Sequence, residues 1–475
     1  MGKGNGGFKK LKEDEDMETL FDNINEVESN LNPDLVSNSN VKPASSSTPP
    51  PPPPQQQQQQ PDMVQNNANE ANNNAPNKYQ VVDINTESTI VEEESDLPVY
   101  NKNIPQVNDL KIKKPERLYW VDCLRVFASY LVVFIHCSNV LLKPSIDYKS
   151  FNGRVLIAFC AFTRPCVPLF IMISGMLFLN PKKKVTLKMI FNKYIPRIFK
   201  CYLFWTLYYG IIDKYIIKYD NKTYIFNKDL IIEMIKVCII RGCGHLWYLN
   251  FTIGVYLMTP IYRPVVRDRT LGWYLVALCC IVAQLVPTIH EFFIIVFGID
   301  FQVIRTYIEN LVIYTAGNYL GYYIIGYMVA SHEFSKKRYI YLSYFIGLLG
   351  NVLSVVFRFI SCYHYNKNVH NLSKYYNFNV CMGAYGTFVF FKYAVNGWVR
   401  KRGKTFLKII KLLSDCSMGV YLIHFTMYHI FYKLNFHSQL LNPLYWVPIY
   451  SLILYAVCFA MVYVLRKVPF IKEFM

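Results

Sequence analysis

Long apolar segments recur along the chain from Tyr119 onward, and polar connections separate them. Each segment has roughly twenty residues, about the length that an α-helix needs to cross a ~30 Å hydrocarbon core. The pattern predicts an all-α, multi-pass membrane protein with about ten transmembrane helices. The expected spans are 119–142, 154–179, 195–217, 246–266, 271–289, 309–330, 338–361, 377–396, 410–432 and 444–465.

The first 110 residues have a different pattern. They contain an acidic run at 13–16, six prolines at 49–54, six glutamines at 55–60 and an Asn-rich segment that ends near Asn77. Such a composition buries too little apolar surface to offset the entropy of ordering the chain. We therefore predict a disordered, low-complexity cytoplasmic tail at 1–110 and a ten-span membrane domain at 111–475.

Composition agrees with a membrane location. Apolar residues make up 53% of the chain and charged residues only 17%, whereas soluble domains average about 25% charged residues. The tail has a net charge of −11, and the remainder of the chain has a net charge of +29. This balance argues against a soluble, single-domain enzyme.

Basic residues predict the orientation of the spans, because cytoplasmic loops are enriched in Lys and Arg. With ten spans, the basic connections on one side are 182–200, 263–269, 336–338, 400–408 and 466–467. The basic loop 218–245 is the exception on the opposite side. We therefore expect both termini in the cytoplasm and the protein in the plasma membrane or a secretory-pathway membrane.

Two glycosylation sequons test this orientation. The segments Asn221-Lys222-Thr223 and Asn371-Leu372-Ser373 both fall in connections on the predicted non-cytoplasmic side. Because only lumenal loops are glycosylated, Asn221 and Asn371 are candidate glycosylation sites.

The first span contains three ionisable residues, Asp122, Arg125 and His136. Charged groups at membrane depth are costly and are therefore candidates for function. On an α-helix, residues eleven apart differ by about 20° in direction and about 16 Å in height, so Arg125 and His136 share one face at two depths. Asp122 lies one turn before Arg125 and is expected to pair with it and orient it. The alternative is a structural one: an interfacial ion pair, with His136 bonded to a neighbouring helix.

Other spans add polar groups at comparable depths, namely Arg164, Ser174, His245 and His424. The three histidines fall toward the predicted lumenal side, and Arg125 and Arg197 fall toward the cytosol, as expected for a path across the membrane. Gly175 is expected to allow close helix packing. The thirteen cysteines show no CxxC pair or metal-like spacing with histidine, so we expect no bound metal or cofactor, and we expect no nucleic-acid partner.

Four segments carry a family resemblance. They are LYWVDCLRVFASYLVVFIHCS (118–138), TRPCVPLFIMISGMLF (163–178), GHLWYLNFTIGVYLMTPIYRP (244–264) and SMGVYLIHF (417–425). In this order the chain resembles the acyltransferase-3 family of multispan membrane O-acyltransferases over nearly all of 117–466. It is most similar to the branch that contains the enterobacterial common antigen O-acetyltransferase.

The resemblance implies an acyl-coenzyme A co-substrate, with acetyl as the acyl group, and a hydroxyl acceptor, such as a carbohydrate, on the non-cytoplasmic side. Arg125 and His136 match the family's R-x10-H pair, and His136 would act as general base or transient acyl carrier. Arg197, at a position where the family often has a denser arginine cluster, would bind the donor's phosphates together with Arg125. Arg164 would stabilise the thioester oxygen. Ser174, His245, Trp247 and His424 complete the expected substrate-binding set.

A transporter or channel is the competing interpretation, because buried Arg and His residues also line permeation paths. A lipid or sterol receptor without catalysis is a third. Paired broken helices or inverted repeats would favour transport, and no repeat between the two halves is evident in the sequence. The receptor hypothesis would make His136 dispensable.

Overall fold

A computed structural model describes residues 117–142, 146–212, 244–311 and 319–475, and these residues contain helices and connections but no strand. The predicted all-α class is therefore confirmed for this part of the chain. The tail predicted at 1–110 lies outside the described residues, so its disorder stays a prediction.

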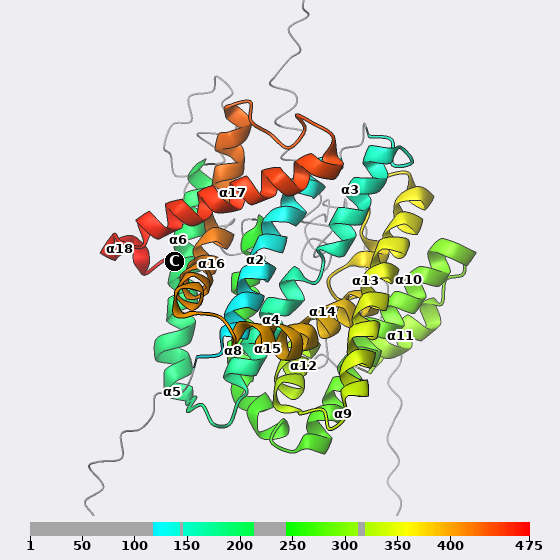
Figure 1. Ribbon diagram of the computed structural model, residues 1–475. Coiled ribbons are helices and arrows are strands. Elements are labelled where there is room, and N and C mark those ends of the chain that lie inside the picture. Colours follow the sequence, from blue (N-terminus) through cyan, green and yellow to red (C-terminus); the bar gives the residue numbers. More distant parts are fainter. Residues whose placement is uncertain (1–116, 143–145, 213–243, 312–318) are drawn as a thin grey trace, which may run out of the picture. The chain divides into compact units, whose positions relative to one another are not determined.

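Figure 1 labels the described helices. The longer helices are α2 (Tyr119–Asn139), α3 (Phe151–Phe162), α4 (Cys166–Phe178), α6 (Ile195–Ile212), α8 (Trp247–Val265), α9 (Arg269–Cys279), α10 (Val286–Phe297), α12 (Leu320–Ser331), α13 (Lys337–Tyr365), α14 (Phe378–Phe390), α16 (Lys404–Lys433) and α17 (Pro443–Leu465). The shorter elements are α5 (Leu187–Met189), α11 (Gln302–Asn310), α15 (Asn396–Val399), α18 (Pro469–Lys472), the 3₁₀ turns η6 (Gly244–Leu246) and η9 (Asn371–Ser373), and the π-helical turns η3 (Ile190–Tyr194), η7 (Cys280–Leu285) and η10 (Phe391–Val395).

Five helical segments in the described residues are long and apolar enough to cross a bilayer. They are Tyr119–Asn139, Phe151–Phe178, Arg269–Phe297, Lys337–Tyr365 and Pro443–Leu465. Helical structure also occurs at each of the other predicted spans, but those helices are shorter or more polar; α12, for example, has only 12 residues. A multi-pass membrane protein is supported, and the predicted number of ten spans is not confirmed.

Helix α2 lies at the centre of the described helices, in contact with α3, α4, α16 and α17. Figure 1 shows it in cyan, with α6 and α16 on one side and α10 and α13 on the other. Its residues Leu124 and Ala128 are fully buried. A central helix packed on several sides has a fixed axis, which matters because α2 carries two of the candidate catalytic residues.

Glycine allows the closest helix contact next to α2. A Cβ atom on Gly175 of α4 would lie 1.7 Å from the backbone oxygen of Tyr323 on α12, and a Cβ on Gly326 of α12 would lie 2.1 Å from the backbone oxygen of Met172. The two backbones touch where neither residue has a side chain, as in other small-residue contacts between membrane helices. The packing role predicted for Gly175 is therefore confirmed.

A buried arginine fixes the connection that follows α4. The guanidinium of Arg263, near the end of α8, donates to the carbonyl oxygens of Phe178 at 2.5 Å, Asn180 at 3.1 Å and Lys183 at 2.8 Å. Carbonyls at the end of a helix otherwise lack partners. Arg263 is therefore structural, and it sets the path of the segment that carries Lys183.

The glycine contact generates a stability prediction. Gly175→Ala should lower the free energy of unfolding by about 1–3 kcal/mol, because the new methyl group must displace the backbone of α12. The matched control is Gly254→Ala on α8, where a Cβ would meet no atom within 4 Å. Thermal unfolding of the two purified variants in detergent measures the difference, and equal melting temperatures would contradict the packing described here.

Candidate active site

The backbone of α2 holds Arg125 and His136 in a fixed relation. The helix continues without a break from Tyr119 to Asn139. The eleven-residue spacing therefore places both side chains on one face, about 16 Å apart along the axis. The unbroken helix that this spacing assumes is confirmed.

Three histidines from three elements meet near the end of α2. The ring of His136 lies 5.1 Å from the ring of His424 on α16, and the ring of His424 lies 5.2 Å from that of His245 in η6, measured between centroids. The phenyl ring of Phe425 contacts all three, at 4.7 Å from His136, 4.5 Å from His245 and 4.7 Å from His424. The sequence placed these histidines at similar depth, and the structure brings them into one cluster.

Hydrogen bonds orient two of these rings. Nδ1 of His424 donates to the backbone carbonyl of Tyr421 at 2.7 Å, and the hydroxyl of Tyr421 donates to the backbone carbonyl of His245. A proton held on Nδ1 leaves Nε2 of His424 as an acceptor in the neutral ring. This atom is buried and has no hydrogen-bond partner among the described residues, and the same is true of Nε2 of His245. The cluster can therefore receive a hydrogen-bond donor from a ligand.

His136 differs from the other two histidines in exposure and in hydrogen bonding. Its side chain is partly exposed, although the residues on either side of it, Ile135 and Cys137, are buried. No hydrogen bond to its ring occurs among the described residues. A partly exposed imidazole without a fixed hydrogen-bond partner is available to take or deliver a proton.

Basic side chains gather near the start of α2. Burial lowers the pKa of the Lys183 amino group, and the positive charges of Arg125, Arg263 and Lys193 lower it further. The amino group of Lys183 lies 4.3 Å from the ring centre of Phe178 and 5.7 Å from that of Tyr194. The sequence identified Arg125 but missed Lys183, because its position depends on the loop that Arg263 fixes.

Arg197 belongs to the same region. It is exposed on α6, and both Arg197 and Arg125 are close enough to Tyr256 to interact with it electrostatically. The ring of Tyr256 in turn packs 4.5 Å from that of Phe178. Arg125, Lys183, Lys193 and Arg197 thus form a basic cluster, which can attract a ligand with several negative charges.

Asp122 has a stronger partner than the one expected. Arg117 forms a two-point contact with it, Nε to Oδ2 at 2.6 Å and Nη2 to Oδ1 at 3.0 Å, whereas Nη1 of Arg125 lies 3.8 Å from Oδ1. The hydroxyl of Ser414 on α16 also donates to Oδ1 at 2.7 Å. The expected pair with Arg125 exists, but Asp122 mainly joins α2 to α16.

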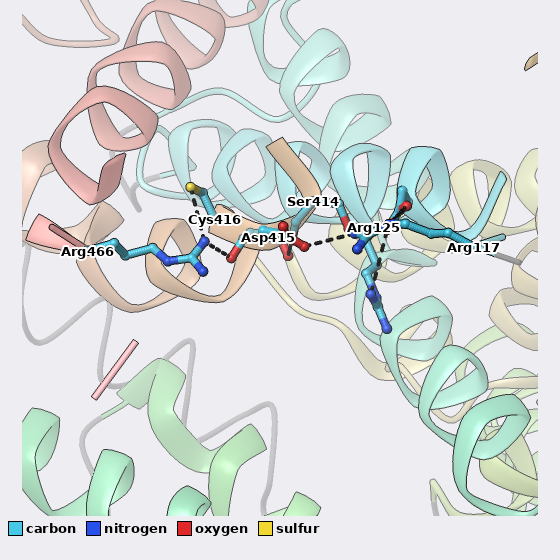
Figure 2. Close-up of polar contacts among 8 residues, drawn as sticks. Arg117, Arg125, Ser414, Asp415, Cys416 and Arg466 are labelled. Atoms are coloured by element: carbon cyan, nitrogen blue, oxygen red, sulfur yellow. Dashed lines mark hydrogen bonds and ion pairs between the residues drawn. The ribbon is translucent and has the colours of Figure 1, made fainter. Parts of the chain in front are cut away.

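Figure 2 shows how this network extends along α16. Arg117 also bonds Asp415 at 2.8 Å, and Arg466, after α17, donates to the backbone carbonyl of Asp415 and lies 3.4 Å from the sulfur of Cys416. The hydrogen bond with Asp122 raises the pKa of Arg117 above its ordinary value. This network fastens the start of α2 to α16 and to the end of α17.

Arg164 lies in the break between α3 and α4, where Pro165 follows it, and is almost completely buried, with 2% of its surface exposed. Its Nη2 donates to Nδ1 of His370 at 2.5 Å, and its guanidinium lies 4.9 Å from the ring centre of Tyr375. Arg164 is also close enough to His136 for electrostatic interaction.

The remaining expected binding residues lie at separate places. Ser174 donates to the carbonyl of Phe170 at 3.0 Å and lines a small pocket together with Tyr248 and Tyr323. Trp247 packs 5.2 Å from Tyr319, between ring centres. Neither residue contacts the three histidines in an interaction recorded for the described residues. Their substrate-binding roles stay predictions.

The two sequons have different status. Asn221 lies outside the described residues. The side chain of Asn371 donates to Glu291 at 3.3 Å, and Ser373, the third residue of its sequon, is fully buried. A glycan on Asn371 would require that contact to open, so glycosylation at both sites stays a prediction. No cluster of potential metal ligands occurs in the described ranges.

Two residues next to Arg164 were not predicted from the sequence. They are Arg358 on α13 and His370 in the connection that follows α13. Arg358 is fully buried and contacts His370, as Arg164 does. A charged residue inside the apolar segment 338–361 satisfies the same rule that identified Arg125. The signal was therefore in the sequence for Arg358, whereas only the fold brings His370 to it.

Comparison with known families assigns a class to this arrangement. A family model described as an acyltransferase domain, that of the acyltransferase-3 family, matches residues 118–463. The match covers well over half of the chain and includes the three histidines and Arg125. The protein belongs to the acyltransferase-3 family, and its apolar helices make it an integral membrane acyltransferase. Comparisons with curated proteins and with solved structures found no match.

The Asp122 network generates a second stability prediction. Arg117→Met should lower the free energy of unfolding by about 1–3 kcal/mol, because the buried carboxylate of Asp122 keeps only its weaker partners. Arg117 is partly exposed, so screening by solvent limits this loss. Arg338→Met removes an exposed arginine whose bond to Tyr339 joins adjacent residues, and it is the control. Thermal unfolding compares them, and a loss no larger in Arg117→Met than in the control would disprove the bracing role.

The lowered pKa of Lys183 generates a pH prediction. As pH rises, Lys183 loses its charge earlier than an ordinary lysine does, so the KM for a polyanionic donor should increase on the alkaline side. Lys183→Arg keeps the charge at all accessible pH values, so the same increase should be smaller. The measurement is donor KM against pH for both proteins, and identical profiles would exclude Lys183 from donor binding.

Proposed function

We propose that this acyltransferase moves an acyl group from cytosolic acyl-coenzyme A to a hydroxyl group, on a glycan, at the non-cytoplasmic side of the membrane. The observation that carries the proposal is the arrangement along α2. A basic cluster lies near Arg125 at one end, and His136 meets His245 and His424 at the other. One rigid helix thus connects a site for a polyanion to a site for proton transfer.

The basic cluster suits the phosphate groups of coenzyme A. Arg125 and Arg197 would form bidentate contacts with phosphate oxygens, and Lys183 and Lys193 would add positive charge. The thioester lies at the far end of a long, flexible pantetheine arm. With the phosphates held near Arg125, this arm can extend along the face of α2 toward His136, about 16 Å away along the helix axis.

His136 acts as the general base in this mechanism. Its imidazole removes the proton of the acceptor hydroxyl as that oxygen attacks the thioester carbonyl carbon. A carbon–oxygen bond forms and the carbon–sulfur bond breaks, so the products are an ester and the thiol of coenzyme A, which receives the proton. Such catalysis typically contributes about 10²–10⁴-fold. A transient acyl group on His136 is the two-step alternative.

His424 and His245 position the acceptor. Both rings have a buried Nε2 atom without a partner among the described residues. His424 already holds a proton on Nδ1, so its Nε2 can accept a hydrogen bond from a second hydroxyl of the acceptor. A sugar offers several neighbouring hydroxyl groups, which favours a glycan over a simple alcohol.

The resemblance of the motifs to the enterobacterial common antigen O-acetyltransferase branch supports acetyl as the acyl group. The basic connections support a cytoplasmic location for both termini and for the donor site, in a plasma or secretory-pathway membrane. Lipid surrounds the helices, and acyl-coenzyme A is a co-substrate rather than a bound cofactor.

The test uses membranes that contain wild-type protein or His136→Ala at equal abundance. Acetyl-coenzyme A labelled in its acetyl group is supplied, and label is followed into lipid, glycan and protein fractions. We expect His136→Ala to lose transfer by about 10²–10⁴-fold, since proton removal from the hydroxyl is lost.

The control is His364→Ala, which removes an exposed histidine at the end of α13. It should keep wild-type transfer. Full transfer by folded His136→Ala would refute the catalytic role of His136. Absence of label in every fraction with wild-type protein would refute acetyl-coenzyme A as the donor.

A further inference from the structure

Two buried arginines share one histidine beside the active site. The exposed fractions of Arg164 and Arg358 are 2% and 0%, and a nitrogen of each guanidinium contacts Nδ1 of His370. Arg358 also donates to Ser373 at 3.2 Å and to Asn368 at 2.8 Å. Ser373 and Asn368 are uncharged, and His370 accepts both contacts through Nδ1.

His370 does not compensate the two positive charges. Burial lowers the pKa of His370 well below its ordinary value, and the charges of Arg358 and Arg164 lower it further. The ring is therefore neutral, with Nδ1 as acceptor and the proton on Nε2. Arg164 and Arg358 therefore contribute two positive charges that His370 does not neutralise.

The described residues supply no carboxylate to this pair. Glu291 accepts a hydrogen bond from Asn371 and forms an ion pair with Lys374 at 3.8 Å. No ion pair of Arg164 or Arg358 with an acidic residue occurs within the described ranges. The ring of Tyr375 beneath Arg164 gives partial compensation. Like charges buried together without a counter-ion are strongly destabilising.

Three N–H groups at this place lack an acceptor. Nε of Arg164, Nε of Arg358 and Nε2 of His370 are buried and have no hydrogen-bond partner among the described residues. All three are donors in the protonation states given above. An unpaired set of donors with net positive charge requires a ligand that only accepts hydrogen bonds, which is the property of an oxyanion.

Two successive hydrogen bonds join this arginine pair to the end of α2. The Asn368 side chain that receives the bond from Arg358 donates to Oδ1 of Asn139 at 3.3 Å. Asn139 lies three residues after His136, about one helical turn away, so the two side chains are neighbours on α2. The arginine pair is therefore close to the three histidines and distant from the basic cluster near Arg125.

We propose that Arg164, Arg358 and His370 form a second anion site, which binds a phosphate group carried by the acceptor and so places the acceptor hydroxyl at His136. This inference rests on the proposed function and names its acceptor class. A phosphate monoester carries about −1.5 to −2 charges at neutral pH, which balances two arginines, whereas a carboxylate would leave one charge uncompensated. Arg164 then binds the acceptor, and groups other than Arg164 stabilise the thioester oxygen.

The test measures binding without any transfer reaction. Full-length protein is purified in detergent without phosphate, and melting temperatures are compared in inorganic phosphate, sodium glucuronate and sodium chloride at equal ionic strength. Wild-type protein should melt about 2–4 °C higher in phosphate than in chloride, because a ligand that binds only the folded state stabilises it. Arg358→Gln and Arg164→Gln should lose this increase.

Arg197→Ala is the matched control, because it removes an arginine from the other anion site. It should keep a phosphate-dependent increase in melting temperature, which shows that the increase arises at the arginine pair. If a glutamine variant does not fold, Arg358→Lys keeps one charge and should keep part of the increase. No phosphate-specific increase in the wild type, or an undiminished one in both glutamine variants, overturns the proposal. An increase in glucuronate but not in phosphate would overturn the phosphate class.

Transfer kinetics separate this inference from the function on which it rests. Arg358→Gln should raise the KM for acceptor about tenfold or more and leave the KM for acetyl-coenzyme A unchanged, and Arg197→Ala should do the reverse. Absence of the phosphate-dependent increase in wild-type protein that transfers normally would refute the anion site alone. Phosphate binding without any transfer by wild-type protein would refute the proposed function alone.

Discussion

A charge in an apolar interior needs partners, and three groups of buried charges in the described part of the chain differ in how far the chain supplies them. Asp122 is matched by Arg117 and Ser414, and the result is a brace between α2 and α16. Arg263 is matched by three backbone carbonyls, and the result is an ordered connection after α4. Arg164 and Arg358 contact neutral groups, and the Nε atom of each is buried without a hydrogen-bond partner among the described residues. Where the chain supplies these partners the charged residue is structural, and where it does not, we propose that a ligand supplies them.

The same distinction explains the position of the active site on α2. The Asp122 brace and the burial of Leu124 and Ala128 fix the axis of this helix. In the proposed mechanism, the spacing of Arg125 and His136 on this fixed axis sets a constant separation between the donor phosphates and the reacting groups. The proposed mechanism needs little else from α2, because the other two histidines come from α16 and η6 and meet His136 through tertiary packing.

Much of the fold was predictable, because apolar segments of membrane length and the R-x10-H spacing are local features of the sequence. The all-α class, the packing role of Gly175 and the family were confirmed. The number of spans was not, since several apolar segments form helices too short or too polar to be recognised as spans by themselves.

Contacts between distant residues could not be predicted in the same way. Arg117 lies before the first span, so a search confined to ionisable groups within spans missed the main partner of Asp122. Lys183 is one of three consecutive lysines, and only the connection held by Arg263 distinguishes it from its neighbours. His370 lies in a connection and acquires its role from two arginines that are 206 and 12 residues away.

In the proposed mechanism, one site joins a cytosolic donor to an acceptor on the other side of the membrane. Sealed vesicles with their cytoplasmic face outward test it most directly, with labelled acetyl-coenzyme A added outside and acceptor enclosed within. We expect labelled acceptor that is protected inside intact vesicles, with free coenzyme A released outside. Labelled acceptor formed only outside the vesicles, or only after the membrane is opened, would contradict it.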